Sequence, residues 1–293
     1  MQKIIPHLWF DHQAEEAVSF YTSIFQNSSI LRESRYGEAG AKVSGVAEGT
    51  IMNMTFQLAG QEFMALNGGP YFTFTPALSF FVNGDTEEEI NENWEKLTPG
   101  GTILMELDTY PFSEKFGWVQ DKFGISWQLN LASRKQKIAP FLMFAGQQHG
   151  KAEEAINQYI SLFPNSGINE IEYNEDAEGT VKRAAFTLGG QEFMAIDGGN
   201  EHSFTFTEAI SLFVNCTTQE EVDMLWEKLS EGGEQGQCGW LKDKHGVSWQ
   251  IVPTALGEML NDSDPVKSKR VIEAMLRMKK IEIAGLREAY EGS

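Results

Sequence analysis

The sequence predicts an α+β protein made of two tandem copies of one domain and a C-terminal helical tail. Long segments recur in the same order, and the clearest pair is AEEAVSFYTSIFQNSSI (14–30) with AEEAINQYISLFPNSGI (152–168). Within each copy the hydrophobic spacing alternates between the strand period and the helix period. The residues after position 253 have no counterpart in the first copy.

Each copy reads as strand, helix and three strands, followed by the same order again. In the first copy the first pass is a strand at 4–10, a helix at 14–25 and strands at 28–36, 50–60 and 61–67. The second pass is a strand at 77–83, a helix at 86–97 and strands at 102–110, 116–121 and 125–131. The pattern is therefore βαβββ, twice per copy.

Turn and capping residues support these boundaries. Gly60, and Gly190 in the second copy, stand between two alternating runs, where a hairpin turn needs positive φ. Thr86 precedes a predicted helix, and Glu89 lies three residues after Thr86, which is the spacing of a capping box.

The repeat also predicts the domain organisation. We expect a first domain at 1–131, a polar, basic linker at 132–137, a second domain at 138–253 and a helical tail at 254–293. In the tail, Asp264 before Pro265 is a typical helix start, and the apolar residues that follow have near-helical spacing.

Composition narrows the class of partner. The chain has 293 residues and a formal charge of −19, which disfavours nucleic acid and anionic membrane surfaces because both are bound largely through Lys and Arg. Neither a leader nor a membrane span is apparent, and two unpatterned cysteines, Cys216 and Cys238, predict a reducing compartment. We expect a cytoplasmic protein with a small-molecule partner, either monomeric through an internal pseudo-dimer or homodimeric.

Several motifs resemble one superfamily. These are P-x-L-x-F at Pro6, AEEA at Ala14, GG before FTFT, and GW-x-x-DK-x-G-x-SWQ in both copies. With the βαβββ order, they resemble the vicinal oxygen chelate superfamily of glyoxalases, bleomycin-resistance proteins and extradiol dioxygenases, and more narrowly its PhnB-like branch in tandem form. The resemblance implies that each copy forms a cup-shaped mixed sheet that holds a ligand or metal, although sites composed across the two copies remain open.

The resemblance also implies where a divalent metal would bind, because such members use His, Gln or Glu from the first, fourth, fifth and eighth strands. His7 stands at the first-strand position, Gln128 at the eighth, and Glu62 is the carboxylate of the fourth strand. The fifth-strand position falls near Ala77, which cannot bind a metal. His7, Glu62 and Gln128 are thus an incomplete candidate set.

The second copy is poorer, with Phe141 in place of His7, Ala209 near the fifth-strand position and Gln250 in the eighth strand. His202 precedes FTFT, where the branch often shows His, while the first copy has Tyr71. These differences predict two cups with different linings. The candidate pocket residues are His7, Trp9, Glu62, Ser79, Gln128, Met143, Glu192, His202, Ser211 and Gln250, whereas the tryptophans repeated between the copies are expected in the cores.

These residues favour a small-molecule-binding protein with a degenerate metal centre, which binds a metabolite or drug in one or both cups and needs no metal cofactor. The alternative is a metal-dependent lyase or transferase-like enzyme that uses a divalent metal as cofactor. The PhnB-like branch often carries a demethylubiquinone methyltransferase label, but no strand is followed by the glycine-rich turn that a Rossmann-type methyltransferase needs. The residues do not identify catalytic groups.

Overall fold

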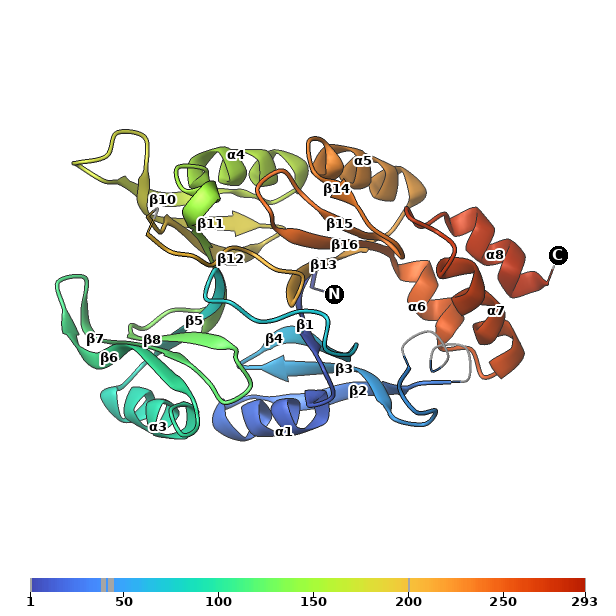
Figure 1. Ribbon diagram of the computed structural model, residues 1–293, viewed down its shortest axis with the longest axis horizontal. Coiled ribbons are helices and arrows are strands. Elements are labelled where there is room, and N and C mark those ends of the chain that lie inside the picture. Colours follow the sequence, from blue (N-terminus) through green and yellow to red (C-terminus); the bar gives the residue numbers. More distant parts are fainter. Residues whose placement is uncertain (1, 38–40, 42–44, 200, 293) are drawn as a thin grey trace.

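The chain folds into two eight-stranded mixed sheets with helices packed against them (Figure 1). The computed structural model describes residues 2–37, 41, 45–199 and 201–292. Sheet A has the order β14-β15-β16-β13-β1-β4-β3-β2. Its strands are β1 (Ile4–Phe10), β2 (Ser29–Arg35), β3 (Ile51–Leu58), β4 (Gln61–Asn67), β13 (Ile210–Cys216), β14 (Glu234–Gln235), β15 (Trp240–Lys242) and β16 (Ser248–Pro253).

Sheet B has the order β10-β11-β12-β9-β5-β8-β7-β6. Its strands are β5 (Leu78–Gly84), β6 (Thr102–Tyr110), β7 (Ser113–Gln120), β8 (Ser126–Leu131), β9 (Ile138–Phe144), β10 (Gly167–Tyr173), β11 (Val181–Leu188) and β12 (Gln191–Asp197). The predicted α+β class and the paired βαβββ modules are therefore confirmed.

The modules pair across the copies, and not within them as the resemblance implied. Sheet A joins the first half of copy one to the second half of copy two, and sheet B joins the other two halves. The linker at 132–137 joins β8 to β9, which runs antiparallel beside β5 in the same sheet. The chain crosses between the sheets through 68–77 and again through a segment that includes 201–209. There Thr75 Oγ1 donates to Thr205 O at 2.7 Å and Thr207 Oγ1 donates to Thr73 O at 2.8 Å. The repeated FTFT motif is this pair of crossovers.

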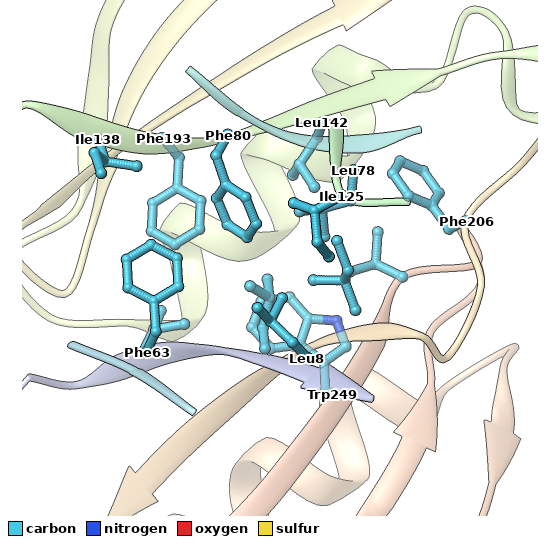
Figure 2. Close-up of a cluster of buried hydrophobic side chains, with 14 of the residues drawn as sticks. Leu8, Phe63, Leu78, Phe80, Ile125, Ile138, Leu142, Phe193, Phe206 and Trp249 are labelled. Carbon is cyan, nitrogen blue, oxygen red and sulfur yellow. The ribbon is translucent and has the colours of Figure 1, made fainter. Parts of the chain in front are cut away.

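The helices beside the two sheets and one face of each sheet enclose the main hydrophobic core. Helices α1 (Ala14–Ile24) and α3 (Glu87–Leu97) lie along one side of the molecule, and α4 (Ala152–Leu162) and α5 (Gln219–Ser230) along the other (Figure 1). Between them the sheets touch directly, because Phe63 of β4 meets Phe80 of β5 with ring centroids 5.1 Å apart (Figure 2). A short 3₁₀ helix at Gly146–Gln148 precedes α4.

The predicted turn and cap are present. Gly60 and Gly190 both have φ of +85° in the β3–β4 and β11–β12 hairpins, the region that only glycine adopts without strain. Thr86 accepts a hydrogen bond from the Glu89 amide at 3.2 Å and so caps α3.

The repeated DK-x-G-x-SWQ motif is explained by a buried carboxylate. Asp243 accepts hydrogen bonds from the amides of His245 (2.9 Å) and Val247 (3.0 Å), the indole of Trp249 (2.8 Å) and the hydroxyl of Tyr159 (2.6 Å). Asp121 accepts the equivalent amide and indole bonds in copy one. Burial raises the pKa of both carboxyls, while these hydrogen bonds lower it. The motif therefore has a structural role.

The tail forms three helices, α6 (Thr254–Leu260), α7 (Pro265–Met275) and α8 (Ile283–Glu291), at the outer end of sheet A (Figure 1). As predicted, Asp264 caps α7, since its carboxylate accepts from the Val266 amide at 2.9 Å. The tail core packs on Val252 of β16 and Phe213 of β13. Within the described residues, no helix combines the length and hydropathy needed to cross a bilayer.

Candidate functional site: one open cup

A cavity of about 560 Å³ lies on the face of sheet B that points away from the core. All eight strands of the sheet contribute side chains to it, so the sheet forms a cup, here called cup B. Alternation along β5 places Phe81 and Asn83 in the cavity, while Phe80 and Val82 are buried in the core. The remaining walls are largely aromatic and methionine side chains, namely Met105, Phe112, Phe116, Trp118, Phe141, Met143 and Met194.

The floor of cup B carries neutral amides. Gln128 is 4% exposed, and its Nε2 donates to the Ser79 hydroxyl at 2.8 Å. No residue in the described part of the chain donates to the Gln128 Oε1. Beside this pair, Asn130 donates to the Asn83 Oδ1 at 3.2 Å. The floor therefore offers a bound molecule a hydrogen-bond acceptor within an apolar wall.

Charged residues line the rest of the cavity. Lys182 pairs with Glu172 at 2.6 Å, and Arg183 pairs with Glu170 at 2.7 Å. Arg134 of the linker also lines cup B and is exposed, and no ion pair joins it to any described residue.

The equivalent face of sheet A, here called cup A, is occupied by its own side chains. Trp9 occupies the position that Met143 has in cup B. Its ring packs edge-on against the rings of Phe72 and Trp240, with ring centroids 4.9 and 5.8 Å apart. Gly68 permits this packing, because a Cβ there would lie 2.2 Å from the Trp9 ring. The Trp240 ring also packs edge-on against the His7 ring, with centroids 5.8 Å apart.

Cup A also differs from cup B in having a shorter hairpin and in being partly covered by the C-terminal tail. In sheet B, β6 and β7 have 9 and 8 residues, whereas their counterparts β14 and β15 have 2 and 3. The tail lies against the shortened hairpin, since the Cys238 and Gly239 amides donate to the carbonyls of Met278 and Lys279 at 2.8 and 2.7 Å. Its helices cover Val252 and Phe213, which correspond to the cavity residues Asn130 and Phe81.

The proposed metal set is not brought together. His7 and Glu62 lie on β1 and β4 of sheet A, but Gln128 lies on β8 of sheet B. The three residues therefore belong to different cups, because the modules pair across the copies.

Among the described residues, neither cup has a donor set that fits a divalent metal. In cup A the residues beside His7 in the sheet are Met64 and Ser211, and Glu62 is two residues farther along β4. In cup B the equivalent position is Phe141, flanked by Ser79 and Met194. No group of three or more His, Cys, Asp or Glu side chains suited to a metal occurs among the described residues.

His7 is buried and uncharged at neutral pH. It is 3% exposed, and its Nδ1 has no hydrogen-bond partner in the described part of the protein. Burial lowers the pKa of His7 to about 4. The other candidates of cup A, Ser211 and Gln250, form the same pair as in cup B, with a distance of 2.9 Å from the Gln250 Nε2 to the Ser211 Oγ.

The remaining candidates lie in or near cup B. Met143 and Glu192 line the cavity, whereas His202 is not among the lining residues and stacks on Phe204, which packs against the cluster that contains Met143. Trp127 and Trp249 are core residues as expected, but Trp118 lines the cavity.

Several lining residues were missed from the sequence, namely Phe81, Asn83, Asn130, Arg134, Lys182 and Arg183. For Asn130, Lys182 and Arg183 the available signal was the difference between the copies at matched positions, whereas Phe81 and Asn83 recur as Phe213 and Asn215. Asn130 matches Val252, and the β2–β3 and β10–β11 registers match Arg183 with Asn53.

Two βαβββ halves closing one cupped sheet are the fold that this protein shares with glyoxalase I from Zea mays. The chain belongs to the family described as 3-demethylubiquinone-9 3-methyltransferase, which matches residues 2–130 and 136–252. No curated protein matches the chain.

Among solved structures, a putative 3-demethylubiquinone-9 3-methyltransferase, PhnB protein, from Bacillus cereus is 52% identical over 45% of this chain and 100% of its own, with a TM-score of 0.42. A Staphylococcus aureus protein is 37% identical over 45% of this chain and 97% of its own, with a TM-score of 0.19. Glyoxalase I from Zea mays shares the fold at 12% identity, with a TM-score of 0.56 over 85% of this chain and 90% of its own.

Proposed function

We propose that this protein binds a small organic molecule in cup B and that cup A has a structural role. The observation that carries the proposal is the contrast between the cups. Cup B encloses about 560 Å³, whereas Trp9, Phe72 and Trp240 pack together at the same place in cup A. A cavity of a few hundred Å³ with apolar walls and a few fixed polar groups is typical of small-molecule sites.

A metal-dependent enzyme is the alternative, and the side chains favour it less. Cup B presents Phe141, Ser79, Met194 and Gln128 where a metal would need His or carboxylate ligands. The family name points to methyl transfer, but β1 is joined to α1 by Asp11, His12 and Gln13, with no glycine to admit a nucleotide-like methyl donor at a helix start. A stoichiometric divalent metal, found by elemental analysis of the purified protein, would restore the enzyme alternative.

The contrast between the cups supplies the test. Met143→Trp introduces into cup B the residue that fills cup A, and Gly198 beside it leaves the same room that Gly68 leaves for Trp9. With the neutral fluorophore N-phenyl-1-naphthylamine as probe, we expect the wild-type protein to bind and Met143→Trp to weaken binding by about tenfold or more.

The matched control is Trp9→Met, which changes cup A alone and should leave the affinity of cup B for the probe unchanged. Absence of probe binding to the wild-type protein, or equal binding by Met143→Trp, would contradict the proposal.

A further inference from the structure

We propose that the molecule bound in cup B is an aromatic compound that carries a negative charge. This inference rests on the proposed function, since it specifies the ligand class of the same cavity. It is drawn from the shape of the walls and from the charges that cup B has and cup A lacks.

The walls of cup B suit a flat ring. Phe81 and Phe141 are stacked with centroids 6.0 Å apart and planes 16° apart, and Phe116 continues the row at 6.2 Å from Phe81. Trp118 adds an indole whose Nε1 is already used by the Ser126 hydroxyl at 2.7 Å. These faces offer dispersion and stacking contacts with few competing polar atoms, and the methionines around them adapt to ring shape.

Cup A serves as an internal reference for the charges. Residues that are the same in both cups are explained by the duplication. We therefore expect the residues that recognise a ligand to be among those found only in the open cup B. Lys182 and Arg183 stand where cup A has Met52 and Asn53.

The carboxylates on β10, which face Lys182 and Arg183 of β11, are also found only in cup B. Glu170 and Glu172 occupy the positions of Arg32 and Ser34 in cup A. They neutralise Arg183 and Lys182 through ion pairs of 2.7 and 2.6 Å.

Among the described cations that line cup B, Arg134 is the one without an ion pair. It precedes Gln136, whose amide is fixed to the backbone of Glu192 by bonds of 2.8 and 2.9 Å, and this anchors the linker at the cavity. Gln2 makes the same two bonds to the backbone of Glu62 in cup A. An exposed guanidinium lining an apolar cavity favours an anionic group on the ligand.

Two further side chains define this site. The Nε of Arg183 is buried and has no partner within the described residues, so its guanidinium retains an unused donor. Glu192 also lines the cavity, but it recurs as Glu62 in the filled cup and is therefore not specific to a ligand. Its negative charge should oppose an anionic ligand.

A pair of probes isolates the charge. 8-Anilinonaphthalene-1-sulfonate and N-phenyl-1-naphthylamine share the same rings and differ by one sulfonate. We expect the wild-type protein to bind the sulfonate about tenfold more tightly, and Arg134→Gln to remove this preference while leaving the neutral probe unaffected. Glu192→Gln should act in the opposite direction and tighten binding of the sulfonate.

Lys135→Gln is the matched control, because it removes the same charge from the neighbouring linker residue, which does not line the cavity. Equal binding of both probes, or the same loss with Lys135→Gln as with Arg134→Gln, would overturn the inference and leave the proposed function standing. If neither probe binds, the proposed function itself fails.

Discussion

Replacing His7 by Phe should make the protein more resistant to acid. The substitution introduces the residue that cup B has at the same position, Phe141, so an aromatic ring is retained against Trp240. It removes a side chain whose pKa is lowered to about 4 by burial, against 6.5 for an unperturbed histidine.

The sign follows from proton linkage. Between pH 6.5 and pH 4 the unfolded chain binds a proton at His7 that the folded chain does not, so stability is lost as the pH falls through this window. From the two pKa values, the loss at pH 5.5 is about 1.4 kcal/mol and at pH 7.5 less than about 0.1 kcal/mol. At pH 5.5 the protein is still above its isoelectric point of about 4.7.

Urea unfolding at pH 7.5 and pH 5.5 measures this directly. The loss of unfolding free energy on acidification should be about 1.4 kcal/mol smaller in His7→Phe than in the wild-type protein, since other titrating groups act equally in both. His12→Gln, at an exposed histidine, should behave like the wild-type protein. An equal loss in His7→Phe and wild type would refute the reasoning.

Three further predictions concern the scaffold. Asp243→Asn should lower the unfolding free energy by about 2–4 kcal/mol in urea titrations, because the amide leaves the buried Trp249 indole without an acceptor; no change would contradict the structural role of this carboxylate. Gly68→Ala should cost about 1–3 kcal/mol in the same assay, since its Cβ would lie 2.2 Å from the Trp9 ring, and a neutral result would mean that cup A has room to repack. Truncation after Pro253 should expose the apolar surface under the tail and cause self-association in size-exclusion chromatography, and a stable monomer would refute this.

Much of the fold could be predicted because it depends on local patterns that occur twice. The Gly60 and Gly190 hairpins, the Thr86 cap and the Asp264 helix start each arise from a few neighbouring residues. The pairing of modules could not be predicted in this way, because all four modules have the same strand order and hydrophobic faces. The crossed pairing is visible only in the strand order of the two sheets.

The same limitation affected the site. His7, Glu62 and Gln128 were grouped because they lie in one copy, but a site is built from strands that are neighbours in the sheet. The cavity residues depend on register and on hairpin length. Arg134 lies in a segment whose composition indicates only a linker, and its place beside the cavity follows from the Gln136 bonds to Glu192.

The crossed pairing also changes what a single substitution can do. In a symmetric dimer of one-copy chains, each substitution would appear in both cups. Here a change in 78–131 reaches cup B alone, while its duplicate in 210–253 reaches cup A alone. Fusion thus allows the linings of the two cups to diverge independently, while the Thr75 and Thr207 bonds join the two crossover segments.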